Sequence, residues 1–202
     1  MQKQRHLDPA GYLSNRTIVA LCSPTGGASS AVRISGTDTH KIFDLLTGAK
    51  SSSANERLAK RYWLKDRAGK KIDDVVGVQY FAPKSFTGED VVEIFIHGSP
   101  IIAQKLIDEV ISHGARVALP GEFSFRGVKN GKMQLSQAEA VKELIAAEND
   151  FSLGLALDKL SGTQHEFIEK IRDELMQLLF LSEAGIDFSD QDLDEVSLPT
   201  LK

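Results

Sequence analysis

Residues 85–98 constrain the fold most, because a strand pattern and chemically active side chains coincide there. Between Asp90 and His97 the residues are β-branched or aromatic, except for Glu93. Side chains of a strand alternate between two faces. One face of this strand is therefore aliphatic and predicts contact with a hydrophobic core, through Val92, Ile94 and Ile96. The opposite face carries Val91, Glu93, Phe95 and His97.

A carboxylate in the middle of a strand must reach water or hold a hydrogen-bonding partner. Glu93 therefore has two interpretations. In the first, it lies on the solvated outer face of an antiparallel strand. In the second, it lies in the floor of a pocket, where the carboxylate accepts N–H groups of a ligand and Phe95 packs on a flat heterocycle. The strand pattern alone leaves both open.

Length and charge limit the class of protein. A chain of 202 residues with 42% hydrophobic residues can bury a core, and its length suits one or two domains. The net charge of −4 argues against a surface devoted to nucleic acid. Basic residues do gather within fifteen positions, where a solvated hairpin is the simpler explanation and a phosphate contact is the alternative: Arg57, Lys60, Arg61, Lys65, Arg67, Lys70 and Lys71.

The single cysteine, Cys22, cannot form an intramolecular disulfide, which favours a reducing compartment. No apolar run reaches the ~18 residues that a membrane span needs. Residues 1–15 lack the apolar segment of a signal peptide. We therefore expect a cytoplasmic protein with no membrane contact.

The order of elements predicts an α+β fold. Residues 1–16 are polar and irregular and are expected to be an extension or a remnant added to the protein, and residues 17–133 to form a first domain. Strands are predicted at 17–22, 31–35, 61–64, 72–81, 90–97 and 115–119. Helices are predicted at 37–46, with Thr37 as N-cap, and from Pro100 to Gly114. Residues 51–55 read as a flexible connector and 120–133 as a loop. The expected result is a mixed sheet with helices on one face.

Two further side chains are candidates for a site. Arg33 stands inside an apolar strand, where a guanidinium is costly unless it meets an anion, a carbonyl or water. Lys132 is a lone loop cation just before a helix. The segment from Gly127 to Met133 imitates a phosphate-binding loop, but it has three residues between its glycines instead of four and no Ser or Thr after the lysine. We therefore reject nucleotide binding there.

From residue 134 the pattern is helical only. Residues 136–139, Ser-Gln-Ala-Glu, predict a capping box. A second, longer helix is predicted from a cap at Asp150 to about Ala184, and the sequence then turns acidic at 187–195. Two helices make a poor bundle. We therefore expect residues 134–202 to be the first part of a helical domain that is cut short.

Several short motifs resemble the N-terminal part of the MnmE family, also called TrmE, of tRNA modification GTPases. They are Phe-Thr-Gly-Glu-Asp-Val-Val-Glu at 86–93, His-Gly at 97–98, Pro-Gly-Glu-Phe-Ser at 120–124 with Arg126, Asn-Gly-Lys at 130–132, Leu135, Gln-Ala-Glu-Ala at 137–140 and Ile-Asp-Phe at 186–188. The resemblance spans about residues 17–195. It implies a tetrahydrofolate-binding domain with the fold of aminomethyltransferases, followed by helices of the family's helical domain.

The resemblance also implies a function. Family members work with the flavoprotein MnmG to build carboxymethylaminomethyl or aminomethyl groups at carbon 5 of the wobble uridine, U34, of certain tRNAs. A 5-formyl- or methylene-tetrahydrofolate supplies the one-carbon unit, and the N-terminal domains form a homodimer. By position in the motifs, Arg33, Glu93 and Lys132 match the folate contacts. No residue is an obvious catalytic nucleophile, and no metal site is expected.

GTP, Mg²⁺ and K⁺ belong, by the same resemblance, to a GTPase domain that this sequence does not contain. The chain alone should therefore not hydrolyse GTP. Two other functions stay open: a stand-alone folate-dependent one-carbon transferase, and a dimerisation scaffold without a ligand.

Overall fold

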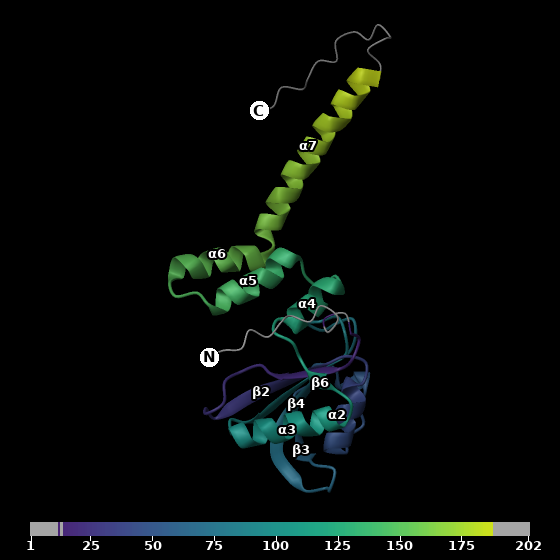
Figure 1. The fold of residues 1–202 in the computed structure, drawn as a ribbon, viewed down its shortest axis with the longest axis vertical. Helices are drawn as coiled ribbons and strands as arrows, with labels where there is room; N and C mark the ends of the chain where they lie inside the picture. Colours follow the sequence, from purple (N-terminus) through teal and green to yellow (C-terminus); the bar gives the residue numbers. More distant parts are fainter. Residues whose placement is uncertain (1–11, 13, 188–202) are drawn as a thin grey trace. The chain divides into compact units, whose positions relative to one another are not determined.

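The computed structural model describes residue 12 and residues 14–187. Their contacts divide the chain into unit 1, residues 1–138, and unit 2, residues 139–202. Unit 1 is built on a sheet (Figure 1). In the described part its strand order is β3-β4-β5-β2-β1-β6. The strands are β1 Ile18–Leu21, β2 Ser29–Ser35, β3 Lys60–Lys65, β4 Lys71–Tyr80, β5 Val91–His97 and β6 Arg116–Val117.

The sheet is mixed, as predicted. Neighbouring strands run antiparallel, except that β6 runs parallel to β1. The strand predicted to carry the chemistry, β5, is central and pairs with β2 on one side and β4 on the other. Strands from distant parts of the sequence thus bring their outward side chains next to Glu93.

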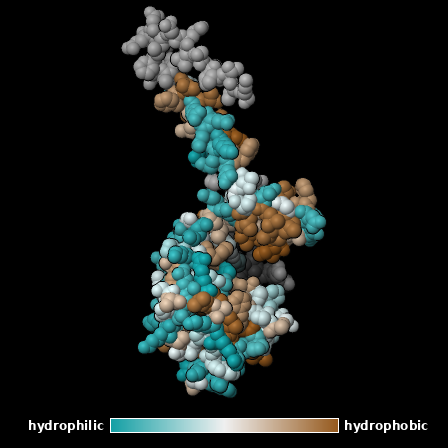
Figure 2. Space-filling model, turned by 180° about the vertical axis from the view of Figure 1, so that it is seen from behind, coloured by the Kyte–Doolittle hydropathy of each residue, from teal (hydrophilic) through white to brown (hydrophobic). Residues whose placement is uncertain are grey.

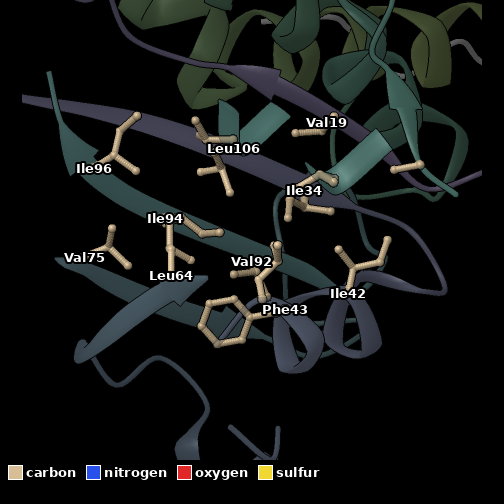
Figure 3. Close-up of a cluster of buried hydrophobic side chains, with 14 of the residues drawn as sticks. Val19, Ile34, Ile42, Phe43, Leu64, Val75, Val92, Ile94, Ile96 and Leu106 are labelled. Atoms are coloured by element: carbon tan, nitrogen blue, oxygen red, sulfur yellow. The ribbon is translucent and has the colours of Figure 1, made fainter. Parts of the chain in front are cut away.

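The hydrophobic core lies on one face of the sheet, under helices α2 (Thr39–Thr47) and α3 (Pro100–Ser112) (Figure 3). Val92, Ile94 and Ile96 are at most 1% exposed, as the strand pattern predicted. A side chain at Gly77 of β4 would lie 2.8 Å from the Phe43 ring of α2. Glycine at this position therefore permits the close approach of helix and sheet.

Two boundaries differ from the sequence predictions. Helix α2 has Asp38, not Thr37, at its N-cap, and no side chain caps it. Instead, the Asp38 N–H donates to Thr17 Oγ1 of the neighbouring strand end. The connector predicted at residues 51–55 contains a short 3-10 helix, η1 (Ser53–Asn55), because Ser52 accepts a hydrogen bond from the Ala54 N–H.

The prediction of a loop at residues 120–133 is wrong for most of this segment, because Glu122–Lys129 forms helix α4. Two glycines at 121 and 127 and a preceding proline suggested a loop. Gly121 instead serves as the N-cap with a φ of 74°. Gly127 lies inside the helix, where a side chain would clash with the carbonyl oxygen of Phe86 at 3.0 Å.

Helix α5 (Leu135–Ile145) leads out of unit 1, and α6 (Asp150–Ser161) and α7 (Thr163–Asp187) follow. The predicted capping box at Ser136 is wrong, since Ser136 lies inside α5. The Gln137 side chain instead accepts a hydrogen bond from the Gln134 N–H. The single helix predicted from Asp150 is two helices, because Gly162 takes a left-handed φ of 88°. Asn149, not Asp150, caps α6.

Unit 2 leaves most of its apolar side chains exposed, and Figure 2 shows them gathered over α6 and along α7. The most exposed are Ile145, Phe151, Phe167, Ile168, Leu175 and Phe180. No helix in the described ranges is both long and apolar enough to cross a membrane. From position 188 onward, the predicted acidic stretch lies outside the residues that the structure describes.

Candidate functional site

Two of the three predicted site residues meet across the sheet. Arg33 of β2 lies directly opposite Glu93 of β5. The Arg33 Nε and Nη2 atoms donate to the same carboxylate oxygen, Glu93 Oε1, at 2.9 and 2.7 Å. Both side chains are about one fifth exposed, at 23% and 21%. The arginine predicted to need an anion therefore has one, and the carboxylate predicted to need a partner has the arginine.

Aromatic rings surround this ion pair. The Arg33 guanidinium carbon lies 4.9 Å from the centre of the Phe86 ring and 5.4 Å from that of Phe123, both within range of a cation–π contact. On the other side of the carboxylate, the Tyr80 hydroxyl donates to Glu93 Oε2 at 3.3 Å. Among the described residues, Oε2 accepts only this long hydrogen bond. Glu93 can thus accept further N–H groups without losing Arg33.

The ion pair affects the titration of its neighbours. Burial raises the pKa of Tyr80 above its ordinary value of 10.0, and the Glu93 charge raises it further. Burial also raises the pKa of Cys22, although the Arg33 charge opposes this. Both groups are therefore neutral near pH 7.

Lys132 lies apart from this pair. Its side chain is exposed, and Nζ makes no hydrogen bond or ion pair within the described residues. Its aliphatic stem packs on Gly88, where an added Cβ would lie 3.0 Å from Lys132 Cγ. The neighbouring Asn130 donates from Nδ2 to the Thr87 carbonyl oxygen at 2.7 Å. The turn with Lys132 is therefore attached to the loop that also carries Phe86, but no contact in the described chain joins Lys132 to Arg33 or Glu93.

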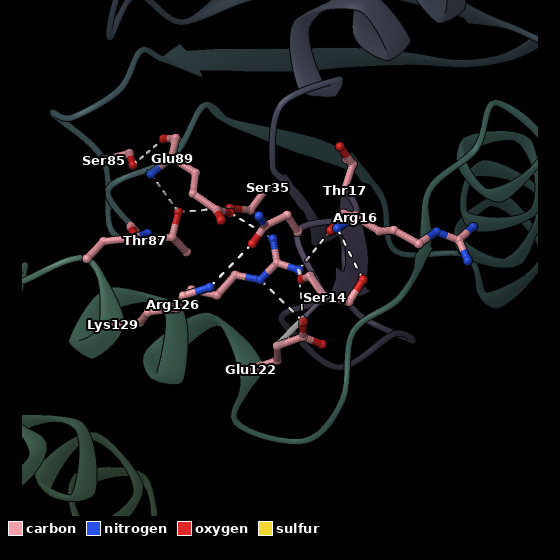
Figure 4. A network of polar contacts seen from close by, with 12 residues as sticks. Ser14, Arg16, Thr17, Ser35, Ser85, Thr87, Glu89, Glu122, Arg126 and Lys129 are labelled. Carbon is pink, nitrogen blue, oxygen red and sulfur yellow. Dashed lines mark hydrogen bonds and ion pairs between the residues drawn. The ribbon is translucent and has the colours of Figure 1, made fainter. Parts of the chain in front are cut away.

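A buried network centred on Arg126 of α4 holds this loop in place (Figure 4). The Arg126 side chain is 2% exposed. Its Nη1 donates to Glu89 Oε2 at 2.8 Å, and its Nη2 to Glu122 Oε1 at 2.9 Å. Glu89 in turn accepts a hydrogen bond from Ser35, and Ser35 is also bonded to Thr87. The network therefore links α4, the end of β2 and the loop before β5.

The network also includes part of the chain before β1, which the sequence predicted to be an extension or an added remnant. The Arg126 Nη2 atom donates to the carbonyl oxygens of Arg16 at 2.7 Å and Ser14 at 3.3 Å. The Arg16 side chain donates to the Gly114 carbonyl oxygen. Residues 14–16 are thus attached to unit 1.

Glu122 is the most deeply buried carboxylate of the network, with a side chain that is 0% exposed. It accepts hydrogen bonds from Arg116 Nη1 and Nη2 at 2.7 and 2.6 Å and from the Leu119 N–H at 2.8 Å. Burial raises its pKa, but the hydrogen bonds from Arg116, Leu119 and Arg126 outweigh burial and hold the pKa below its ordinary value of 4.5. Sequence reasoning gave Arg126 and Glu122 no role, although both belong to the motifs that carry the family resemblance.

A cavity of about 300 Å³ lies elsewhere, between the β3–β4 turn and α3, and contains none of the three predicted site residues. Among the described residues, no group of three His, Cys, Asp or Glu side chains could hold a metal ion.

Comparison with known families decides the relationship. Residues 17–132 match the family described as the N-terminus of the GTP-binding protein TrmE. The chain belongs to the TrmE (MnmE) family. Residues 135–202 match the MnmE helical domain. The predicted resemblance to this family is therefore confirmed, and so is the α+β class of the fold.

Curated TrmE relatives carry the name tRNA modification GTPase MnmE. The chain is 42% identical to the relative from Thermotoga petrophila over 176 residues, which are 87% of this chain and 39% of the relative. It is 40% identical to the relative from Opitutus terrae over 186 residues, 92% of this chain and 40% of the relative. The chain thus spans about two fifths of the length of these TrmE proteins.

Proposed function

We propose that the chain is the tetrahydrofolate-binding, dimerising N-terminal part of a tRNA modification GTPase. In this proposal residues 17–133 bind folate and form a homodimer, and residues 134–202 begin the helical domain. The whole protein would work with the flavoprotein MnmG to install carboxymethylaminomethyl or aminomethyl groups at carbon 5 of U34 in the cytoplasm. The names and matched residues of the TrmE relatives support the proposal.

The observation that carries the folate proposal is the Arg33–Glu93 pair between aromatic rings. A pterin ring presents adjacent N–H groups, and a carboxylate accepts two such donors in a strong, charge-assisted arrangement. Glu93 Oε2 has capacity for such donors. Phe86 and Phe123 offer apolar surface for a flat ring, and Arg33 and Lys132 are cations suited to the carbonyl and glutamyl carboxylate groups of a folate. The residues present therefore fit the cofactor.

The geometry of α4 supports the proposal that the chain does not bind GTP by itself. A phosphate-binding loop offers its backbone N–H groups to the phosphates. Here Gly127 lies within α4, and the Lys132 N–H already donates to the Gly127 carbonyl oxygen at 2.8 Å. That hydrogen bond leaves the Lys132 N–H unavailable to a phosphate. GTP, Mg²⁺ and K⁺ would instead be bound by a GTPase domain outside residues 1–202.

Calorimetric titration with 5-formyltetrahydrofolate tests the folate proposal. We expect the chain to bind this folate and Glu93→Ala to weaken binding by about thirty-fold or more, since a charge-assisted contact in a partly desolvated site is worth about 2 kcal/mol or more. Glu143→Ala is the matched control, because it removes a glutamate that is ion-paired with Lys159 in unit 2. Equal folate affinity of Glu93→Ala and wild type would show that Glu93 does not hold the cofactor.

The proposed homodimer rests on the family relationship alone. Light scattering of the chain at micromolar concentration tests it, with twice the chain mass as the expected result and the mass of a single chain as the result against it.

A further inference from the structure

The face of the sheet opposite the core carries exposed aromatic rings at the β3–β4–β5 end. Arg61, Val76 and Phe95 form one cross-strand row on this face. Trp63 belongs to the next row along β3. Trp63 is 42% exposed and Phe95 is 39% exposed. Exposed aromatic rings on an open sheet are unusual for a merely solvated face, because they present flat apolar surface to water.

Two lysines stand next to these rings in an arrangement that favours an anion. Lys65 of β3 lies directly opposite Lys71 of β4. Like charges in this position destabilise a strand pair unless a negative group lies between or above them. Lys71 Nζ lies 3.9 Å from the centre of the Trp63 ring, and its charge also acts on Asp74, but neither ammonium group lies within ion-pairing distance of a carboxylate in the described ranges. The Lys71 ammonium group and the Trp63 ring therefore lie side by side on this surface.

The hairpin formed by β3 and β4 is positively charged. Residues 60–74 contain six Lys or Arg and three Asp, in a chain whose net charge is −4. The acidic side chains already have partners. Asp74 is paired with Arg61, Asp73 with the His97 ring and backbone, and Asp66 accepts the Lys70 N–H. The cations that remain available for an external ligand are lysines.

We propose that this surface, formed by Trp63, Lys65, Lys71 and Phe95, binds unpaired nucleotides of an RNA. Sequence-tolerant binding of single strands combines aromatic rings, on which bases stack, with cations that contact the phosphates. The surface offers both within the β3–β4–β5 part of the sheet, where Lys65 and Lys71 lie beside an irregularity in the β3–β4 pairing. A protein partner of apolar character would not explain the opposed lysines, and a regular RNA duplex would not present bases to the rings.

The contact between Lys71 and Trp63 does not block this binding. Stacking of a base on an indole ring is stronger than a cation–π contact at an exposed site. An entering base therefore displaces the ammonium group from the ring, and the flexible lysine can then reach the adjacent phosphate.

The inference rests on the proposed function, because the TrmE relatives are named as tRNA modification enzymes. It deepens that proposal by placing the RNA beside the folate site. Phe95 is two residues from Glu93 on the same face of β5, a separation of about 7 Å along the strand. A nucleotide stacked on Phe95 would thus lie next to the proposed source of the one-carbon unit.

Trp63 is the only tryptophan of the chain and therefore a direct probe of this surface. We expect titration with an RNA hairpin that carries an unpaired loop to quench the Trp63 fluorescence, and a blunt duplex of the same stem to quench it far less. Affinity is measured in parallel from the anisotropy of the labelled hairpin, at several salt concentrations.

The double variant Lys65→Ala/Lys71→Ala tests the role of the cations. We expect weaker binding of the hairpin and a plot of log affinity against log salt whose slope is smaller by about 1.4, since each phosphate contact to a single strand contributes about 0.7. Lys41→Ala/Lys50→Ala is the matched control. It removes the same charge from exposed lysines at the two ends of the α2 region, on the core side of the sheet. This control should bind as wild type does.

Three results would overturn the inference: no binding of the hairpin, binding without quenching of Trp63, or equal losses in the two double variants. None of them bears on the folate proposal, which is tested by the Glu93→Ala titration. Folate affinity measured on Lys65→Ala/Lys71→Ala should equal that of wild type, because neither lysine belongs to the Arg33–Glu93 site.

Discussion

Single residues of unit 1 show how much structure a buried charge requires. Glu122 is fully buried, and removing a charged group from water without partners costs several kcal/mol. Two arginines and a backbone N–H compensate this cost, and Arg126 is itself satisfied by Glu89 and by carbonyl oxygens of residues 14 and 16. The loss of the Glu122 carboxylate would remove the negative partner that Arg116 and Arg126 share.

The lowered pKa of Glu122 predicts how stability depends on pH. A carboxyl whose pKa is lower in the folded than in the unfolded chain stabilises the fold above the unfolded value, and this contribution is lost as pH falls through the folded value. The unfolded value is near 4.5. We expect Glu122→Gln to be clearly less stable than wild type in urea at pH 7. The difference should shrink as pH is lowered below 4.5, and a difference that stays constant down to about pH 3 would contradict the assigned pKa.

Sequence reasoning identified the residues of the ion pair but not their partnership. Arg33 and Glu93 were each conspicuous as a charge in an apolar strand. Their contact depends on the pairing of β2 with β5, which are sixty positions apart, and local periodicity carries no information on that pairing. Arg126 and Glu122 were not recognised, because a charged residue in an expected loop needs no buried partner.

At the scale of elements, the strands and helices with a strong apolar period were predicted, and those shaped by glycine were not. The six strands and the two core helices of unit 1 follow the pattern of buried side chains in the described chain. Helix α4 was not predicted because it contains Gly127, and glycine weakens a helix. The close packing of Gly127 against Phe86 is a tertiary contact that the local sequence does not reveal. The error at Gly162 is the reverse. The apolar period around Gly162 predicted one continuous helix, although Gly162 ends α6.

The loop between β4 and β5 depends on Gly88, which predicts an effect of Gly88→Ala. Gly88 has a φ of 77°, and an added Cβ would lie 2.9 Å from Asn130 Cβ and 3.0 Å from Lys132 Cγ. The left-handed backbone costs an alanine about 1 kcal/mol, and the contacts should add about 1–3 kcal/mol. We expect the free energy of unfolding in urea to fall by the sum.

Gly69→Ala provides the control for this substitution. Gly69 has nearly the same φ, 78°, and no atom within 4 Å of an added Cβ. Its alanine variant should therefore lose only the backbone contribution. Equal losses in the two variants would show that the turn carrying Lys132 is not packed against Gly88.

At the scale of the whole molecule, the two units differ in what holds them together. Unit 1 encloses a continuous core of strand and helix side chains. In unit 2 the described side chains of α7 are nearly all exposed, and α6 buries little beyond Ala156. The sequence predicted helices there from their apolar period, but that period says only that a partner surface is needed and not which surface supplies it.

This difference predicts how the two units exchange amide hydrogens. A helix without tertiary packing is marginal in water, even at the length of Thr163–Asp187, and opens with a free energy near zero. Amides of the central strand β5 exchange only when unit 1 unfolds. We expect hydrogen exchange followed by mass spectrometry to show rapid labelling of peptides from α7 and slow labelling of peptides from β5. Adding urea below the unfolding transition of unit 1 should not change the order. Protection of α7 equal to that of β5 would mean that its apolar side chains are covered in solution, and the prediction would then be wrong.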